Sequence, residues 1–197
     1  MKTKYGQGAG TRQKILEAAA RVFGQSGYWN AAMEDIAASA GVAKGTLYLH
    51  FPGKEALFLA VVERTLEELS ARMLEDVSRL PLRERLRSKI RTYLSFFEER
   101  AACFHAVTQE HSGLTRQFAE MFWKNFMEKC GRIEEEIRKE IAAGRIRNIQ
   151  PSDLLFLMVG MMHGAIHQWF LSGRNYCLAD KADEIADIVY CGIRSEP

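Results

Sequence analysis

The stretch MEDIAASAGVAKGTLYLHF, residues 33–51, decides how the chain folds. Its apolar residues before Gly41 recur at the spacing of one helical face, and two acidic residues occupy the first turn, where the helix dipole favours negative charge. Gly41 stands where a left-handed cap ends a helix, and Val42 places an apolar residue under the turn. Beyond it, Leu47 and Phe51 are four residues apart and face the core from a second helix. The stretch therefore predicts two short helices joined at a glycine.

A helix, a glycine turn and a second helix form the plan of a helix-turn-helix motif, whose second helix lies in the major groove of DNA. The second helix here carries no carboxylate, and its donors suit phosphate oxygens, which fix register without reading bases. These donors are Lys44, Thr46, Tyr48, His50 and, just beyond the helix, Lys54. The same pattern also fits a solvated helical hairpin inside an all-α protein.

A dense series of short motifs runs from Thr11 to Leu57 at fixed spacing: Ile15-Leu16, Ala18-Ala19, Phe23, Gly27-Tyr28, Asp35-Ile36-Ala37, Gly41-Val42, Lys44-Gly45-Thr46-Leu47-Tyr48, His50-Phe51 and Lys54-Glu55. In these residues the chain resembles the DNA-binding domain of TetR-family repressors. The resemblance implies a DNA-binding site made of Thr11, Arg12, Lys44, Gly45, Thr46, Tyr48, Leu49, His50 and Lys54. Beyond this first quarter only the helical pattern and the general layout are similar.

Two positions depart from the family pattern. Ala31 and Ala32 stand where a Ser or Thr usually caps the first helix of the motif. Either Asn30 caps that helix one position early, or the cap is lost at a cost of about 1 kcal/mol. Ala43 replaces a frequent Ser, which puts one further phosphate contact in question. Leu49 occupies a variable position of the recognition helix, where it contacts either a thymine methyl or a sugar.

Charge is unevenly distributed along the 197 residues, although the net charge is only +2. Residues 1–54 hold seven Lys/Arg against three Asp/Glu, a net +4, whereas residues 55–197 carry a net −2. Positive charge therefore lies where DNA would bind. A second basic series is formed by Arg83, Arg85, Arg87, Lys89 and Arg91. Its arginines could suggest nucleic acid, but we expect them to pair with Glu84, Glu98 and Glu99 on a solvated helix.

The remaining composition favours a soluble cytoplasmic protein. The four cysteines form no CxxC pair, so we expect free thiols in a reducing compartment; they are Cys103, Cys130, Cys177 and Cys191. The longest apolar run, residues 154–162, is shorter than the roughly 20 residues that span a bilayer. The chain has no phosphate loop after a strand, no nucleophile elbow and no evident carboxylate pair, so we expect no enzyme, cofactor or structural metal.

Helical periodicity continues through the whole chain, and the fold class is therefore all-α, with about nine helices. We expect a flexible arm over residues 1–10, a three-helix DNA-binding domain over 11–53, and a larger helical domain over 54–197. The first helix carries an apolar stripe that ends at Gly24–Gly27, and a long helix opens at Lys54. By resemblance, the larger domain binds an effector and forms a dimer.

The last two helices carry the candidate dimer interface. Gly160 and Gly164 are four residues apart, so the backbone of their helix can approach another helix closely. Together with Ile185, Ile188 and Val189 they form a plausible helical interface. The resemblance implies a four-helix bundle across a two-fold axis, with two DNA half-sites some 34 Å apart. A purely intramolecular core is the alternative.

A set of aromatic, methionine and histidine side chains forms the candidate effector pocket. An apolar lining with few polar groups suits a small molecule, although the same pattern is also typical of a plain core. The candidates are Phe104, His105, Phe118, Met121, Phe122, Trp123, Phe126, Met158, Met162, His163 and His167.

These observations support one hypothesis and two alternatives. The hypothesis is a homodimeric TetR-like repressor that binds a pseudo-palindromic operator and leaves it when an apolar small molecule binds. One alternative is a metal-responsive repressor, because His163 and His167 are four residues apart and Cys103 or His105 are possible distant partners. The other is a helical binding module that does not bind DNA, which would lack a steep salt dependence.

Overall fold

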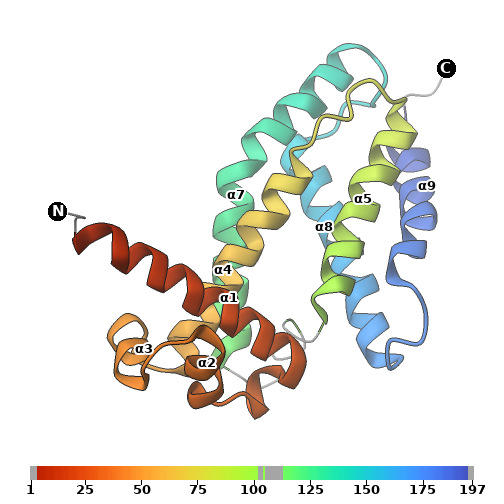
Figure 1. The fold of residues 1–197 in the computed structure, drawn as a ribbon. Helices are drawn as coiled ribbons and strands as arrows, with labels where there is room; N and C mark the ends of the chain where they lie inside the picture. The colour runs from red at the N-terminus through yellow and green to blue at the C-terminus, as the bar shows by residue number, and fades with distance from the viewer. Residues whose placement is uncertain (1–3, 102–103, 105–112, 195–197) are drawn as a thin grey trace. The chain divides into compact units, whose positions relative to one another are not determined.

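The computed structural model describes residues 4–101, 104 and 113–194, except for the side chains of residues 4–9, 113–115, 118, 122 and 125–130. Within these ranges the chain forms eight α-helices, one 3-10 helix and no named strand (Figure 1), so the all-α prediction is confirmed. The residues divide into two compact units: unit 1 runs to Leu66 and includes Arg100–Met121, and unit 2 comprises Glu67–Glu99 and the chain from Phe122 onward.

Unit 1 holds the N-terminal helices and the beginning of a longer one. These are α1 (Lys4–Asn30), α2 (Met33–Ala40), α3 (Lys44–His50) and the first part of α4 (Lys54–Met73). The ring of Phe58 in α4 meets the ring of Phe23 edge-on, with the centroids 5.2 Å apart, and lies 4.8 Å from the ring of Tyr28. The start of α4 thus belongs to the core of unit 1, which runs to Leu66, whereas the predicted DNA-binding domain ends at residue 53.

Helix α1 begins earlier than predicted. Residues 4–10, expected to belong to a flexible arm, continue the helix up to the predicted start at Thr11. This stretch contains no proline, and extending an existing helix needs no new nucleus, so the glycines there do not prevent helix. Near the other end, Gly27 leaves helical geometry with φ 73° and ψ 165°, which agrees with the predicted break.

The turn between α2 and α3 has the predicted geometry. Gly41 is left-handed, with φ 65° and ψ 36°, and the Val42 amide donates to the carbonyl of Ala37 over 3.0 Å. Neither helix has a side-chain cap at its N-terminus, where Ala32 and Ala43 stand. The Asn30 side chain instead donates to the Ser26 carbonyl at 3.1 Å. The cap of α2 is therefore lost and is not moved one position earlier.

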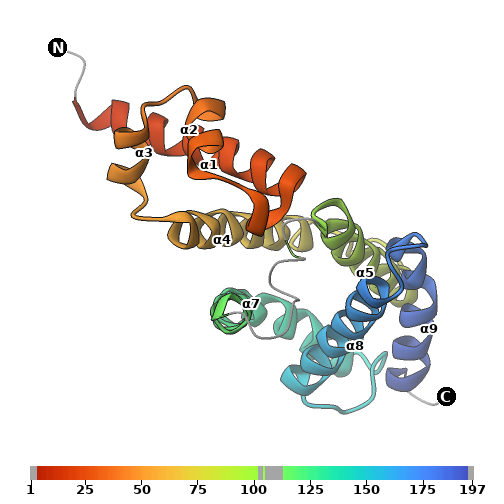
Figure 2. The ribbon, with the colours of Figure 1, turned by 90° about the horizontal axis from the view of Figure 1, so that it is seen from below.

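Unit 2 is a helical bundle in which α5, α8 and α9 lie side by side (Figures 1 and 2). Its elements are α5 (Leu82–Glu99), α7 (Gly113–Ala142) from Phe122 onward, α8 (Pro151–Leu171), η1 (Leu178–Asp180) and α9 (Lys181–Ile193). Ile90 and Leu94 of α5 are almost completely buried, as are Ala182 and Ala186 of α9. Small residues on α9 let the two helices approach closely.

Helix α8 is the one helix in the described part of the chain that is long and apolar enough to cross a membrane. The apolar run of residues 154–162 is shorter than this helix, because the helix continues through residues of intermediate polarity. Its buried side chains recur every three or four residues: Pro151, Leu154, Leu155, Val159, Met162, Ile166 and Trp169. This stripe belongs to the interior of unit 2, so one face of α8 packs in the core.

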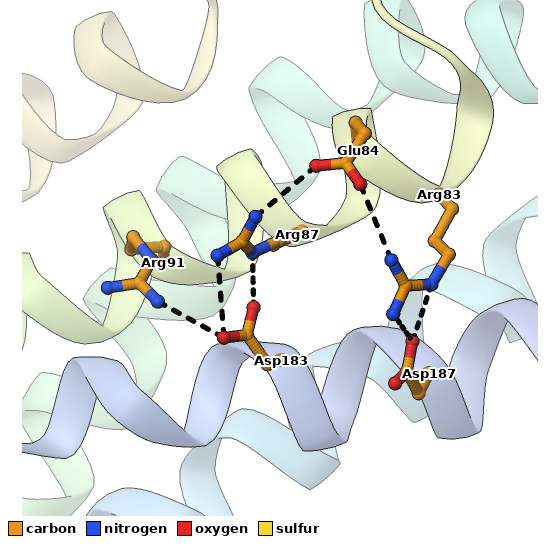
Figure 3. Close-up of polar contacts among 6 residues, drawn as sticks. All are labelled: Arg83, Glu84, Arg87, Arg91, Asp183 and Asp187. Atoms are coloured by element: carbon orange, nitrogen blue, oxygen red, sulfur yellow. Dashed lines mark hydrogen bonds and ion pairs between the residues drawn. The ribbon is translucent and has the colours of Figure 1, made fainter.

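A series of ion pairs joins α5 to α9 (Figure 3). Asp183 pairs with both Arg87 and Arg91, and Arg83 reaches Asp187 over 2.6 Å. Glu84 adds contacts of 3.4 Å to Arg83 and Arg87. The arginines therefore serve the fold, as expected, but Arg83, Arg87 and Arg91 pair mainly with aspartates of α9. Arg85 pairs instead with Glu140 of α7 over 2.8 Å. Of the expected partners, Glu98 accepts hydrogen bonds from the backbone of η1, and Glu99 pairs with Arg72.

Candidate functional site

Helix α3 presents one face to the core and another to the outside. Leu47 is fully buried and Phe51, just after the helix, is almost fully buried. Four residues of the helix are exposed, and they are Lys44, Gly45, Tyr48 and Leu49, while Thr46 and His50 are half-buried. Because the exposed residues recur one turn apart, they share a single face. This face contains four of the nine predicted DNA-binding residues.

The charge on this face is partly balanced within the motif. The Lys44 ammonium forms an ion pair with the Glu34 carboxylate of α2 and lies 5.9 Å from the centre of the Tyr48 ring. The hydrogen bond from Lys44 lowers the pKa of Glu34, and the same bond raises the pKa of Lys44. Both side chains are well exposed, so the pair is open to exchange with solvent or with another anion.

Lys54 lies where its ammonium serves the fold of unit 1. Its Nζ donates to the carbonyl of Trp29 at 3.2 Å and to that of Ala31 at 3.1 Å. The same cation lies 4.8 Å from the centre of the Tyr28 ring. These contacts tie the first residue of α4 to the end of α1. Two of the three Lys54 donors are thus used within the fold, and its contact with phosphate stays a prediction.

The two remaining DNA candidates lie at the predicted start of the first helix. The guanidinium of Arg12 stacks 5.2 Å from the centre of the Phe51 ring, and the rest of the residue is exposed. Thr11 is half-buried. The contact brings Arg12 to the end of α3, so its charge adds to that of the exposed face.

The effector candidates are divided between the two units. Unit 1 contains Phe104, which is almost completely buried, and Met121, which is half-buried. In unit 2, Met162 is buried, His167 is exposed, and Trp123, Met158 and His163 are intermediate. His105 lies outside the described residues, as do the side chains of Phe118, Phe122 and Phe126.

A polar pair lies within the apolar interior of unit 2. The Tyr93 hydroxyl is 2.8 Å from Nε2 of His163, and the Phe97 ring centre lies 6.2 Å from that of His163. Burial lowers the pKa of His163 and raises the pKa of Tyr93 well above 10.0, so both groups are neutral near pH 7. Tyr93 is not among the predicted site residues, and the one sequence signal for it is a hydroxyl group among aliphatic and phenyl side chains.

The histidine pair proposed for a metal does not converge. His163 bonds Tyr93, whereas the side chain of His167 is exposed. Among the described residues, no group of three or more His, Cys, Asp or Glu side chains is placed to hold a metal ion. Cys103 and His105, the distant partners considered, lie outside those residues.

The outer face of α8 is apolar and contains two glycines. Phe156, Leu157 and Leu171 are exposed to 60%, 58% and 75%. They lie one turn or more from the exposed Gly160 and Gly164, where an added side chain would meet nothing within 4 Å. The subunit itself therefore does not require these glycines to be small.

Of the three candidate interface residues in helix α9, only one is exposed. Ile188 is 56% exposed, whereas Ile185 and Val189 are buried in the core of unit 2. These two residues pack within their own subunit, and their place in a dimer interface stays a prediction. Phe156 and Leu157, which sequence reasoning did not select, are more exposed than either of them.

Comparison with known proteins yields one family. Residues 15–61 match the family model described as bacterial regulatory proteins, tetR family. The chain is similar to the HTH-type transcriptional regulator AcrR of Shigella flexneri, with 27% identity over 193 residues that cover 91% of this chain and 87% of that protein.

Two solved structures share the fold at 21% identity. The transcriptional regulator FadR from Bacillus subtilis, in complex with stearoyl-CoA, has a TM-score of 0.72 and covers 92% of this chain and 99% of its own. A transcriptional regulator from Saccharomonospora viridis, in complex with choline, has a TM-score of 0.75 and covers 95% of this chain and 100% of its own.

Proposed function

We propose that this protein, which belongs to the TetR family of bacterial transcriptional regulators, binds operator DNA through α3 and releases it when a small molecule binds the helical interior. The exposed face of α3 carries the DNA-binding part of the proposal. It offers Lys44 and Tyr48 as hydrogen-bond donors and contains no carboxylate. The buried Leu47 side chain anchors the helix in the core. A helix of this kind fits the major groove.

Lys44 has to exchange partners when DNA binds. In the free protein its ammonium pairs with Glu34. A phosphate would take the place of that carboxylate, and Glu34 would remain as an exposed anion near the DNA. Such competition weakens binding to any duplex and favours sites where base contacts add to the phosphate contacts.

The operator is read by a dimer in this proposal. The exposed apolar residues of α8, together with Ile188 of α9, supply a face that a second copy would cover. Gly160 and Gly164 allow a close approach between the two α8 helices. A two-fold axis implies a pseudo-palindromic operator.

The effector is expected to be apolar and uncharged where it enters unit 2. The interior offers phenyl rings and the neutral Tyr93–His163 pair, which has no charge to balance a buried carboxylate or ammonium group. A molecule with a long apolar part and one hydrogen-bonding group fits this chemistry. Stearoyl-CoA and choline, which the two similar structures contain, differ too widely to define it.

Coupling between effector and operator is assigned to α4. This helix starts at Lys54, which is bonded to the end of α1, and its residues after Leu66 belong to unit 2. If the effector prefers a conformer that misplaces α3, operator affinity falls by about 5- to 150-fold for a typical coupling of 1–3 kcal/mol. We expect the protein to act as a repressor in the cytoplasm, where its operator DNA lies.

The test is DNA binding across salt concentrations, with duplexes from upstream of the protein's own gene and an unrelated duplex of equal length. A preference of around a thousandfold, with two subunits or a multiple per site, would support a specific regulator. Equal affinity for all duplexes would contradict operator recognition. No binding even at low salt would favour the helical binding module, and metal-dependent binding would favour the metal-responsive alternative.

A further inference from the structure

Gly45 has no explanation in the fold of the protein itself. It lies inside α3, is exposed, and a side chain added there would meet nothing within 4 Å. Its backbone does not have the positive φ that favours glycine. Glycine inside a helix is less favourable than alanine. Helix α3 has only seven residues, so one unfavourable residue is a large part of it. An exposed position that gains nothing from glycine within the subunit points to something outside that approaches closely.

Leu49 lies one turn further along the same face. Its exposed fraction of 84% is the highest among the large apolar side chains of the described residues. The nearby exposed residues Lys44 and Tyr48 both carry hydrogen-bond donors, whereas Leu49 carries none. Leu49 therefore offers the α3 face an apolar group and no means of bonding a phosphate.

The chemistry of the major groove limits what a leucine can recognise there. Base edges in the groove display donors, acceptors and one kind of apolar group, the C5 methyl of thymine. A leucine side chain cannot use the donors or acceptors. If α3 lies in the groove, the thymine methyl is the one feature of the base sequence that Leu49 can distinguish.

We infer that Gly45 and Leu49 together form a base-reading strip, in which Gly45 admits the groove wall close to the α3 backbone and Leu49 contacts a thymine methyl. The inference rests on the proposed binding of DNA by α3. It assigns sequence selectivity to the two residues of the face that lack donors, and it leaves Lys44 and Tyr48 as phosphate contacts. If Leu49 lay against a sugar instead, the protein would bind duplexes with thymine and with uracil equally.

The first experiment uses a duplex selected from a random library by the full-length protein. Each thymine of one half-site is replaced in turn by uracil, which removes only the methyl group. We expect at least one replacement to weaken binding of the natural protein about fourfold, the size of one buried methyl. The Leu49→Ala variant should bind the thymine and uracil forms of that duplex equally.

Two results would overturn the assignment of Leu49. One is equal binding of every thymine and uracil pair by the natural protein, and the other is a uracil effect that persists in Leu49→Ala. Failure to select any duplex is different, because it would overturn the proposed DNA binding itself and the inference with it.

The second experiment tests Gly45. Gly45→Ala should raise the thermal midpoint of unfolding, because alanine favours helix, and yet weaken binding of the selected duplex roughly tenfold, the size of one lost base contact. Gly24→Ala is the matched control, since Gly24 is also an exposed helical glycine with open space around it. It should raise the midpoint and leave affinity unchanged. Unchanged affinity in Gly45→Ala would refute the close approach.

Discussion

The Tyr93 hydroxyl and Nε2 of His163 lie 2.8 Å apart in the interior of unit 2, and burial keeps both groups neutral. Because the pKa of His163 is lowered, the unfolded chain binds a proton that the native protein does not bind in the interval between the lowered value and 6.5. Stability therefore rises with pH across that interval and is partly lost as pH falls below 6.5.

We expect the free energy of unfolding to decrease when pH is lowered from about 7 toward 5, as measured by urea denaturation. Replacing His163 by Gln should reduce this dependence, since the titrating group is gone. His167→Gln is the control, because His167 is exposed four residues later on the same helix. An equal pH dependence in the natural protein and in His163→Gln would contradict the assignment.

The ion pairs between α5 and α9 should contribute modestly to stability. Asp183 accepts from Arg87 and Arg91, and all three side chains are between 41% and 49% exposed. Asp183→Asn is expected to cost about 1 kcal/mol at low salt and less in 1 M salt, because exposed pairs are screened. Glu184→Gln removes only a contact with Lys181 within α9 and should cost less. A loss from Asp183→Asn that does not depend on salt would argue against an electrostatic origin.

Tyr48→Phe should weaken binding to every duplex alike. The hydroxyl would bond a phosphate, and losing a hydrogen bond to a charged group costs about 1.5–3 kcal/mol, or roughly tenfold or more in affinity. The salt dependence should be unchanged, since no charge is removed. Fluorescence anisotropy on selected and random duplexes measures both quantities. A loss confined to the selected duplex would instead make Tyr48 a base-reading residue.

Ile188→Glu should separate the proposed dimer. It places a charge at an exposed apolar residue of α9 without touching the buried Ile185 or Val189. Sedimentation of the variant should yield monomers at concentrations where the natural protein is dimeric, and operator affinity should fall because half-sites are bound independently. Ala142→Glu, at an exposed position at the end of α7, should leave the mass unchanged. If the Ile188→Glu protein remained dimeric, the dimer interface would lie on another face.

Much of the architecture could be predicted because its signals are local. Pro151 opens α8 and Gly41 closes α2, and both act through their own backbone geometry. The apolar stripe around Leu47 likewise indicates which side of α3 is buried. In these cases one residue or one helical turn contains the whole physical cause.

The parts that could not be predicted depend on partners far along the chain. Arg87 and Asp183 are 96 residues apart, and no local rule pairs them. The bonds from Lys54 to the carbonyls of Trp29 and Ala31 likewise join residues more than 20 positions apart. The periodicity of α9 identifies an apolar stripe, but only packing shows that Ile185 faces inward and Ile188 outward.

Five of the seven positions of α3 are either buried or exposed, and Thr46 and His50 are half-buried. Leu47 is completely buried, whereas Lys44, Gly45, Tyr48 and Leu49 are all exposed. If α3 reads the operator as proposed, a copy of this protein that arises by gene duplication can acquire a new operator specificity through mutations that never enter its core. A library that varies the same four positions should consist mostly of folded regulators, each differing from its parent in the promoter that it controls.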